Sequence, residues 1–233
     1  MKVLLTGAGR GIGFALAKEF IKNKRCELYV ISRSRKNLRI LSEECASINR
    51  GAKVVPVVFD LDRLVEEDLP PEMNCDRLDI IVNNAGLLVR KDFVSTTVSE
   101  MTKMFTTNLF VPALLIQKTL KLLGGDQPSH IINIGSMGGF QGSRKFPGLS
   151  LYSASKAALA SLTECLAAEY SERNIFFNCL ALGAVQTEML NTAFPGYKAP
   201  LTADQMAAFI ADFSLNGYKY FNGKVLPVSG STP

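Results

Sequence analysis

The sequence has few residues of the kinds that build metal sites, disulfides or membrane spans. It contains one histidine, His130, which excludes a histidine-based metal cluster. The five cysteines form no C-x-x-C pair and are odd in number, which favours reduced thiols over a disulfide framework. No apolar run approaches about 18 residues, and the amino terminus enters a glycine-rich stretch too early for a signal peptide. We therefore expect a cytoplasmic protein with no metal and no membrane contact.

The sequence also lacks a concentrated charge of either sign. Its 26 basic and 21 acidic residues give a net charge of +5, and the basic residues are scattered apart from a short run at 32–39. A nucleic-acid-binding domain more often has a dense basic face with interleaved aromatic residues. The composition argues against a nucleic-acid partner, and 233 residues with 47% hydrophobic content suit a soluble enzyme with one core.

A regular alternation of apolar runs and helical patterns fills the whole sequence. Apolar runs that predict strands occupy 2–5, 27–31, 53–59, 78–82, 130–135, 174–182 and 224–228. Helical patterns lie between them, over Gly11 to about Asn23 and about 35–48, 62–68, 98–123, 150–172 and 202–213. Continuous apolar runs are typical of strands buried on both faces, and this alternation gives a parallel sheet with right-handed crossovers. We predict a single α/β domain, a Rossmann-type doubly wound parallel sheet of about seven strands with helices on both faces.

A glycine-rich turn, TGAGRGIG at 6–13, lies between the first strand and the first helix. Glycine lets a backbone turn tightly and approach phosphates, and the following helix N-terminus offers N–H donors to a pyrophosphate. The turn predicts a dinucleotide site, with an ordinary strand–helix turn as the alternative. The spacing Gly7…Gly11…Gly13 differs from G-x-G-x-x-G. It resembles the TGxxxGxG turn of the short-chain dehydrogenase/reductase (SDR) family.

The end of the second strand bears on which dinucleotide would bind. A carboxylate there would hold the ribose 2′-hydroxyl of NAD, whereas an arginine accommodates the 2′-phosphate of NADP. The sequence has Ser32 followed by Arg33, and Arg10 in the glycine turn could approach the same phosphate. Two solvated arginines are the alternative interpretation. The missing acid and the two cations favour NADP(H) over NAD(H).

Four polar residues form the candidate reaction site. Ser136 ends the fifth predicted strand, at the carboxyl edge where open α/β sheets bind ligands. Tyr152 and Lys156 lie one turn apart on the next helix, and Asn108 lies on the long helix after the fourth strand. A tyrosine can give a proton to a carbonyl oxygen, but a phenol with a pKa of about 10 is a poor base for the reverse step. An ammonium group on the same helix face stabilises the phenolate, as does the helix N-terminus.

The resemblance runs from Thr6 to the last predicted strand and implies a role for each matching residue. Tyr152 would be the proton donor, and Ser136 would bind and orient the substrate oxygen. Lys156 would tune Tyr152 and hold the nicotinamide ribose, while Asn108 would hold a water near Lys156. The resemblance implies cofactor contacts at Thr6, Gly7, Arg10, Gly11, Ile12, Gly13, Ser32, Arg33, Asp60, Leu61, Asn84, Ala85, Gly86, Tyr152, Lys156, Val185 and Thr187. It also implies a homodimer or homotetramer and a reaction without metal.

Two stretches depart from the family pattern. The loop between Ser136 and Tyr152 is a few residues longer than expected, and we predict that it bulges at GSRKFPG, 142–148. Leu182 stands where the family commonly has a proline, which affects the local turn rather than the chemistry. The segment near 188–201 matches the family's substrate lid and is short, which predicts a small or open pocket.

We expect an NADPH-dependent oxidoreductase that reduces a small-molecule carbonyl, or oxidises the corresponding alcohol. A 3-oxoacyl carrier-protein reductase stays open within this class, with GSRK at 142–145 as a docking patch for an acidic carrier, as does a pteridine or quinone reductase. The alternative from another class is a non-catalytic NADP-binding regulator, against which the Ser, Tyr and Lys set argues. An extended-type sugar-nucleotide epimerase would need a larger C-terminal region than 188–233.

Overall fold

Seven parallel strands form the central sheet of the structure, a computed structural model that describes residues 1–23 and 25–230. The strands are β1 (Lys2–Thr6), β2 (Glu27–Ser32), β3 (Lys53–Val58), β4 (Ile80–Asn83), β5 (Ser129–Ser136), β6 (Ile175–Leu182) and β9 (Lys224–Val228). Their order is β3-β2-β1-β4-β5-β6-β9, so the direction of winding reverses between β1 and β4. Open α/β sheets bind ligands at the carboxyl end of this switch point. The predicted fold class is confirmed.

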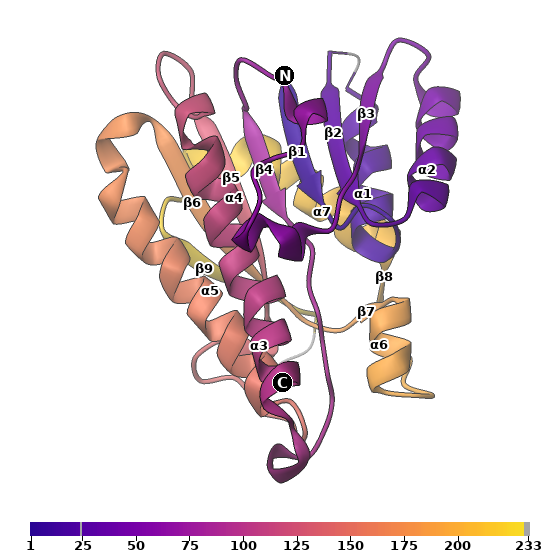
Figure 1. Ribbon diagram of the computed structural model, residues 1–233, viewed down its shortest axis with the longest axis vertical. Coiled ribbons are helices and arrows are strands. Elements are labelled where there is room, and N and C mark those ends of the chain that lie inside the picture. Colours follow the sequence, from indigo (N-terminus) through magenta and orange to yellow (C-terminus); the bar gives the residue numbers. More distant parts are fainter. Residues whose placement is uncertain (24, 231–233) are drawn as a thin grey trace.

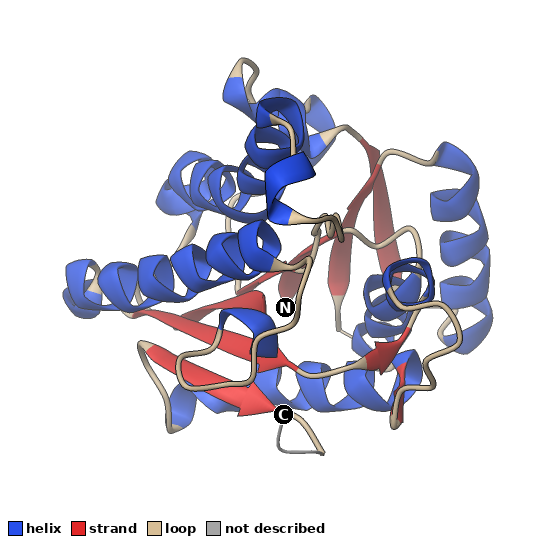
Figure 2. Cartoon of the chain, turned by 90° about the horizontal axis from the view of Figure 1, so that it is seen from below, coloured by secondary structure: helices blue, strands red, loops and turns tan. Residues whose placement is uncertain are grey.

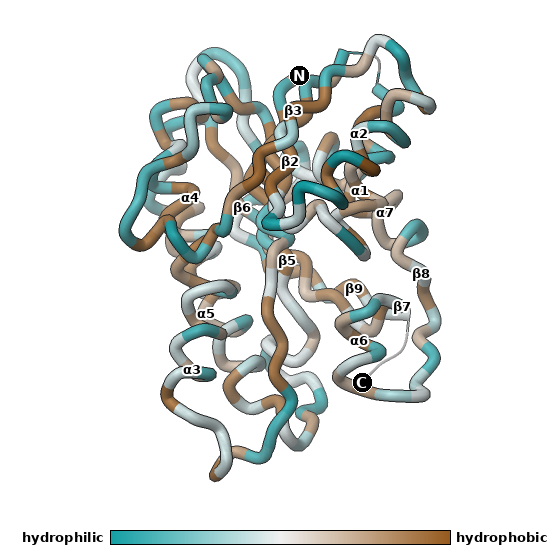
Figure 3. The backbone as a smooth tube through the Cα atoms, turned by 45° about the vertical axis from the view of Figure 1, so that its right-hand side comes forward, coloured by the Kyte–Doolittle hydropathy of each residue, from teal (hydrophilic) through white to brown (hydrophobic). Residues whose placement is uncertain are grey.

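Helices lie on both faces of the sheet (Figures 1 and 2). The first set is α1 (Gly11–Ile21), α2 (Arg35–Ile48) and α7 (Ala203–Asn216), and the second is α3 (Val98–Phe105), α4 (Val111–Thr119) and α5 (Ser150–Glu169). Successive side chains of a strand point to opposite faces. In β1, Val3 and Leu5 accordingly join the core under the first set, while Leu4 joins the core under the second. Figure 3 shows β2 and β3 hydrophobic along much of their length.

The predicted helix over 98–123 is divided in the structure. A π-helical turn, Thr106–Phe110, joins α3 to α4, and a 3₁₀ turn, Leu120–Leu122, ends the run. Thr97 begins α3 with a capping box, because its side chain accepts from the backbone N–H of Glu100 and the Glu100 carboxylate accepts in return. The predicted acidic helix over 62–68 is a shorter 3₁₀ turn, η1 (Leu61–Val65). Neither change moves a strand.

A small second sheet was not predicted. β7 (Val185–Gln186) and β8 (Leu201–Thr202) pair in parallel and bracket a short helix, α6 (Glu188–Ala193). Together they make up the segment expected to be a lid. Two-residue strands carry no readable period, so the sequence alone could not indicate this pairing.

The single histidine lies in the core. His130 begins β5 with 2% of its surface exposed; Nδ1 bonds to the carbonyl of Ser214, and Nε2 lies 3.0 Å from the amide of Asn178. Burial lowers the pKa of His130 to about 4. Cys26, Cys45 and Cys179 are buried as expected of small apolar fillers, while Cys165 is exposed. Among the described residues, no helix is both long and apolar enough to cross a bilayer.

Candidate active site

The glycine turn requires glycine at three positions for two different reasons. Gly7 and Gly11 have left-handed backbones, with φ of 69° and 56°, which L side chains rarely adopt. A Cβ on Gly13 would lie 2.4 Å from the carbonyl oxygen of Gly7. Arg10 precedes α1 and makes no side-chain cap, so the first N–H groups of this helix remain available as donors. The turn is therefore a cradle that fits a pyrophosphate.

Thr6 and Asn84 fasten this cradle to the end of β4. The Thr6 hydroxyl accepts from the backbone N–H groups of Asn84 and Ala85, each at 3.0 Å. The Asn84 amide donates to the carbonyl oxygens of Thr6 at 3.0 Å and Gly7 at 3.3 Å. These predicted cofactor residues hold the two strand ends in register, so their side chains shape the cradle.

The two arginines predicted to hold a 2′-phosphate face carboxylates. Arg33 Nη1 lies 4.0 Å from Asp60 Oδ2, and Arg10 Nη1 lies 2.9 Å from Glu188 Oε2 on the lid helix. Each of these side chains is at least 43% exposed, and such exposed pairs contribute little. A phosphate could therefore replace either partner at small cost. Ser32 ends β2 beside them and brings no negative charge.

The remaining predicted cofactor residues surround the same edge. Asp60 caps η1 by accepting from the backbone N–H of Asp62, and Leu61 is buried behind it. Thr187 begins the lid helix as its N-cap, and its methyl carbon would lie 3.5 Å from a Cβ on Gly11. Ile12 lies on the first turn of α1, and Val185 is buried in β7. The segment predicted to be a lid thus begins next to the glycine turn.

A second glycine pair brings Ser136 to Tyr152. Ser136 ends β5 and caps the 3₁₀ turn Met137–Gly139, where its hydroxyl oxygen accepts from Gly138 N–H at 3.2 Å. A Cβ on Gly138 would lie 2.9 Å from Ser153 Oγ, and one on Gly139 would lie 2.6 Å from a backbone nitrogen of α5. The turn therefore packs directly on the start of α5. Burial raises the pKa of Tyr152, and a side-chain hydrogen bond with Ser136 acts in the opposite direction.

Lys156 is an ammonium group held inside the protein. It is 4% exposed, and its Nζ donates to the carbonyl oxygen of Ile134 at 2.8 Å. Burial lowers its pKa to about 8. A Cβ on Gly86 would lie 3.5 Å from this Nζ and 3.4 Å from Asn108 Oδ1, so three predicted residues converge here.

Asn108 lies in the π-helical turn and is fully buried. Its Oδ1 accepts from the backbone N–H of Leu87 at 2.8 Å, and its Nδ2 donates to the Leu87 carbonyl and to Ser155 Oγ, both at 2.9 Å. The side chain therefore pins the segment after β4 against α5. Wide turns of this kind occur frequently at functional sites.

Ser155 is a member of this arrangement that the sequence did not single out. It is fully buried, accepts from Asn108, and donates to the carbonyl oxygen of Tyr152 at 2.7 Å. The sequence places Ser155 directly before Lys156, but a serine within a helix can form several different local hydrogen bonds, so its position alone indicates no role. Only the fold shows that it joins Asn108 to the helix that carries Tyr152.

The sequence pattern of the family described as short chain dehydrogenase matches residues 1–198. The chain belongs to the short-chain dehydrogenase family. The expected enzyme class, an NAD(P)-dependent short-chain dehydrogenase/reductase, is thereby confirmed.

Several curated relatives and solved structures are similar to this short-chain dehydrogenase. The SDR family protein 7-like dehydrogenase/reductase of Drosophila melanogaster is 30% identical over 83% of this chain, which spans only 60% of that protein. A 3-oxoacyl-[acyl-carrier-protein] reductase of Aquifex aeolicus (strain VF5) is 31% identical over 80% of this chain and 74% of its own length. An NADP-dependent 3-hydroxy acid dehydrogenase of Schizosaccharomyces pombe is 28% identical, over 89% of this chain and 84% of its own. The structure of levodione reductase is 26% identical, with a TM-score of 0.86 over 98% of this chain and 96% of its own.

The long loop of this short-chain dehydrogenase before α5 is closed by one of its own cations. Lys145 Nζ donates to the carbonyl oxygens of Gly138 at 2.9 Å and Phe140 at 2.7 Å, and to Ser143 Oγ at 2.9 Å. Both cations of the GSRK stretch, Arg144 and Lys145, are exposed, but Lys145 is bound to its own loop. At the other departure, Leu182 ends β6 and Gly183 N–H donates to the Val228 carbonyl, so β9 fixes this turn without a proline.

Proposed function

We propose that this short-chain dehydrogenase reduces the carbonyl of a small molecule, or oxidises the corresponding alcohol, with NADP(H). The observation that carries the proposal is the buried Lys156 ammonium, one helical turn from Tyr152 and beside the end of β4. A fully buried lysine is rare because desolvation of the charge is costly. Perturbed ionisable groups of this kind cluster at functional sites.

Each side chain of the set has a stated role in the proposed reaction. A dinucleotide bound at the glycine turn would supply the hydride for the carbonyl carbon. Tyr152 gives its hydroxyl proton to the carbonyl oxygen and becomes a phenolate. Ser136 donates a hydrogen bond to that oxygen, since its own oxygen already accepts from Gly138 N–H. Lys156 opposes the phenolate charge and holds the nicotinamide ribose hydroxyls, while Asn108 positions a water near it.

The residues at the end of β2 support NADP(H) over NAD(H). Ser32 offers no carboxylate to a 2′-hydroxyl, and the ion pairs of Arg33 and Arg10 are exposed enough to exchange for a phosphate. The Schizosaccharomyces pombe relative, which is named an NADP-dependent dehydrogenase, supports the same choice.

A 3-oxoacyl carrier-protein reductase is the second candidate, favoured by the name of the Aquifex aeolicus relative. Such an enzyme docks an acidic protein, and the predicted patch at 142–145 offers only Arg144, because Lys145 is bound within its own loop. We place this substrate second for that reason.

A homo-oligomer is also part of the proposal. The outer faces of α4 and α5 form an apolar groove that includes Leu114, Leu162 and Leu166. A second copy of the chain would cover it, as dimers and tetramers of this family would require.

The test is NADPH oxidation with a panel of aldehydes, ketones and quinones, followed at the nicotinamide absorbance band. We expect at least one panel member to be reduced, and Tyr152→Phe to lower kcat/KM by about 10²- to 10⁴-fold. Tyr220→Phe is the matched control, since Tyr220 also precedes a lysine by four residues but is 79% exposed. NADPH binding with no turnover, and no effect of Tyr152→Phe on any reaction, would favour the regulator instead.

A further inference from the structure

Arg90 lies where three separate parts of the chain meet. It belongs to the segment between β4 and α3, and its guanidinium carbon lies 4.5 Å from the ring centroid of Phe194, at the end of the lid helix. Its Nη1 donates to the carbonyl oxygen of Ala193 at 2.9 Å. The Phe194 ring in turn packs edge-on against Phe146, from the long loop before α5, with centroids 6.4 Å apart. We refer to Arg90, Phe146 and Phe194 as the roof.

The roof stands next to the reaction site. The backbone N–H of Lys91 donates to the carbonyl oxygen of Gly148 at 3.0 Å, and a Cβ on Gly148 would lie 3.2 Å from Arg90 Cγ. Gly148 precedes Tyr152 by only four residues. Gly86, four residues before Arg90, borders Lys156. The segment that carries Arg90 therefore runs from the buried lysine to the start of the helix that carries the tyrosine.

The guanidinium of Arg90 is charged and mostly unbonded. An arginine has five N–H donors in a planar fork. Within residues 1–23 and 25–230, Arg90 makes a single hydrogen bond, to a neutral carbonyl, and forms no ion pair. This leaves the Nε and Nη2 edge of the fork without a protein acceptor.

The carboxylates near the roof do not neutralise it. Glu100 pairs with Lys91 at 3.0 Å, and Glu188 pairs with Arg10 at 2.9 Å. Asp92 is exposed on the same segment and forms no ion pair with Arg90. The long loop adds a further cation, Arg144, whose guanidinium carbon lies 5.8 Å from the Phe146 ring centroid. The rim of the site is therefore positive.

We propose that Arg90 binds an oxyanion of the substrate, so that the enzyme acts on carbonyl compounds that carry a carboxylate or a phosphate. The inference rests on the proposed reductase function and names its substrate class. The free fork edge matches the two oxygens of such a group, which arginine binds with two parallel hydrogen bonds. Stacking on Phe194 holds the guanidinium in place, so less side-chain freedom is lost when it binds an anion.

A purely structural role for Arg90 predicts kinetics that differ from those expected of an oxyanion-binding residue. If Arg90 only ties the lid to the segment after β4, its loss would impair charged and neutral substrates by the same factor. If it binds an oxyanion, its loss would impair charged substrates alone. The ratio of kcat/KM between matched substrates therefore separates the two roles.

The experiment measures NADPH oxidation with two such pairs. One pair is 3-oxobutanoate and its ethyl ester, and the other is the 3-oxobutanoyl thioester of phosphopantetheine and that of pantetheine. The pairs distinguish a carboxylate from a phosphate as the anion. For the preferred charged compound, we expect Arg90→Gln to lower the charged-to-neutral ratio of kcat/KM by about tenfold or more, the size of a lost charged hydrogen bond. Arg90→Lys should recover part of it, and Arg50→Gln, which removes an exposed charge with no bonding partner within the described chain, should not change it.

The ratio in the unmutated enzyme should also fall as salt is raised, because salt screens the attraction of an exposed guanidinium. This measurement needs no variant and stands even if Arg90→Gln folds poorly. A ratio near one in the unmutated enzyme, or equal losses for charged and neutral partners in Arg90→Gln, overturns the assignment. So does reduction of a panel ketone with no turnover of either pair. These outcomes leave the reductase function intact, whereas that function fails when no panel compound is reduced.

Discussion

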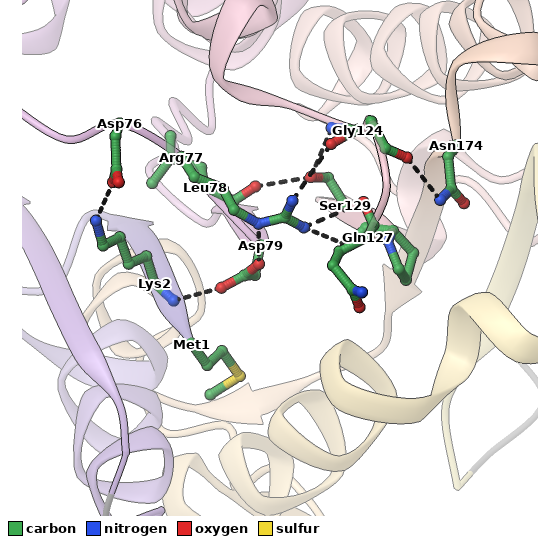
Figure 4. Close-up of polar contacts among 12 residues, drawn as sticks. Met1, Lys2, Asp76, Arg77, Leu78, Asp79, Gly124, Gln127, Ser129 and Asn174 are labelled. Atoms are coloured by element: carbon green, nitrogen blue, oxygen red, sulfur yellow. Dashed lines mark hydrogen bonds and ion pairs between the residues drawn. The ribbon is translucent and has the colours of Figure 1, made fainter.

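The amino-terminal ends of the strands, here called the amino edge of the sheet, and their carboxyl-terminal ends, the carboxyl edge, use the same residue types in opposite ways. Two arginines show this difference. At the amino edge, Arg77 Nε donates to Asp79 at 2.6 Å, and its two Nη atoms donate to the carbonyl oxygens of Gly124, Gln127 and Pro128 (Figure 4). At the carboxyl edge, Arg90 makes one hydrogen bond within the part of the chain that the structure describes. The N–H donors of Arg77 form hydrogen bonds within the fold, whereas most N–H donors of Arg90 are available to a ligand.

The same contrast holds for the charges themselves. Asp79 also accepts from the backbone N–H of Lys2 at 2.7 Å, so the amino edge satisfies its own polar groups. At the carboxyl edge, Lys156 is buried and has no carboxylate partner among residues 1–23 and 25–230. The exposed ion pairs of Arg10 and Arg33 are easily exchanged for a ligand. A dinucleotide and a substrate can form hydrogen bonds and ion pairs with these polar groups of the carboxyl edge. Substitutions at the amino edge should therefore lower the free energy of unfolding, whereas substitutions at the carboxyl edge should lower activity.

The largest expected effect is at Lys156. We expect Lys156→Met to lower kcat/KM by about 10²-fold or more, because the phenolate of Tyr152 loses its countercharge. The same change should raise the free energy of unfolding at pH 7 by about 1–2 kcal/mol, since a buried charge is removed.

The sign follows from the pKa of Lys156, which burial lowers from 10.5 to about 8. At this residue the unfolded chain then binds more protons between pH 8 and 10.5, so the contribution of Lys156 to stability should rise with pH in that window. The stability that Lys156→Met gains at pH 7 should therefore shrink between pH 8 and 10.5. Denaturant unfolding at several pH values measures this. A less stable variant at pH 7 would contradict the contrast between the edges.

Arg77 gives the next effect, in the opposite direction. We expect Arg77→Gln to lower the free energy of unfolding by about 2 kcal/mol, because it strips three carbonyl oxygens and a carboxylate of their donor. Activity per folded molecule should be unchanged.

Arg90→Gln is the matched control for this change. It should lower the free energy of unfolding by less than about 1 kcal/mol, the size of one exposed cation–π contact. Thermal or urea unfolding of the two variants side by side decides the matter, and equal losses would abolish the distinction between the edges.

The smallest expected effect concerns the choice of dinucleotide. Arg33→Gln should raise the Kd for NADPH by about tenfold, because an exposed charged contact with the 2′-phosphate is lost, and should leave the Kd for NADH nearly unchanged. Arg35→Gln, two residues along the chain on α2, removes an equal charge and serves as the control. Fluorescence titration with both dinucleotides measures the difference, and equal weakening of the two would refute the role of Arg33.

The regular parts of this fold could be predicted from the sequence because each has a strong local signal. Strands buried on both faces read as continuous apolar runs, and all seven predicted strands are present within two residues of their expected ends. The glycine turn was predictable for a similar reason, since Gly7, Gly11 and Gly13 are each required by backbone geometry. Ser136 and Tyr152 followed from their places on these elements.

The unpredicted features depend on contacts between distant parts of the chain. The π-helical turn at Asn108 is fixed by Leu87 and Ser155, which no local pattern connects. The surrounding fold decides whether an arginine has a carboxylate partner. Arg10 pairs with Glu188, whereas Arg90 bonds only to a neutral carbonyl among the described residues. Propensity and periodicity describe single elements, so they cannot report such pairings.

The small β7–β8 sheet has a consequence for how reactants enter and leave. Its two-residue ladder, Val185 with Leu201 and Gln186 with Thr202, clamps both ends of the segment 187–200. The entropy of closing this segment into a loop is therefore lost when the protein folds and not at each catalytic cycle. Opening of this segment would break the Arg10–Glu188 and Arg90–Phe194 contacts and would leave the seven-stranded sheet paired. The predicted lid would then exchange reactants as a local unit of low stability on the paired central sheet.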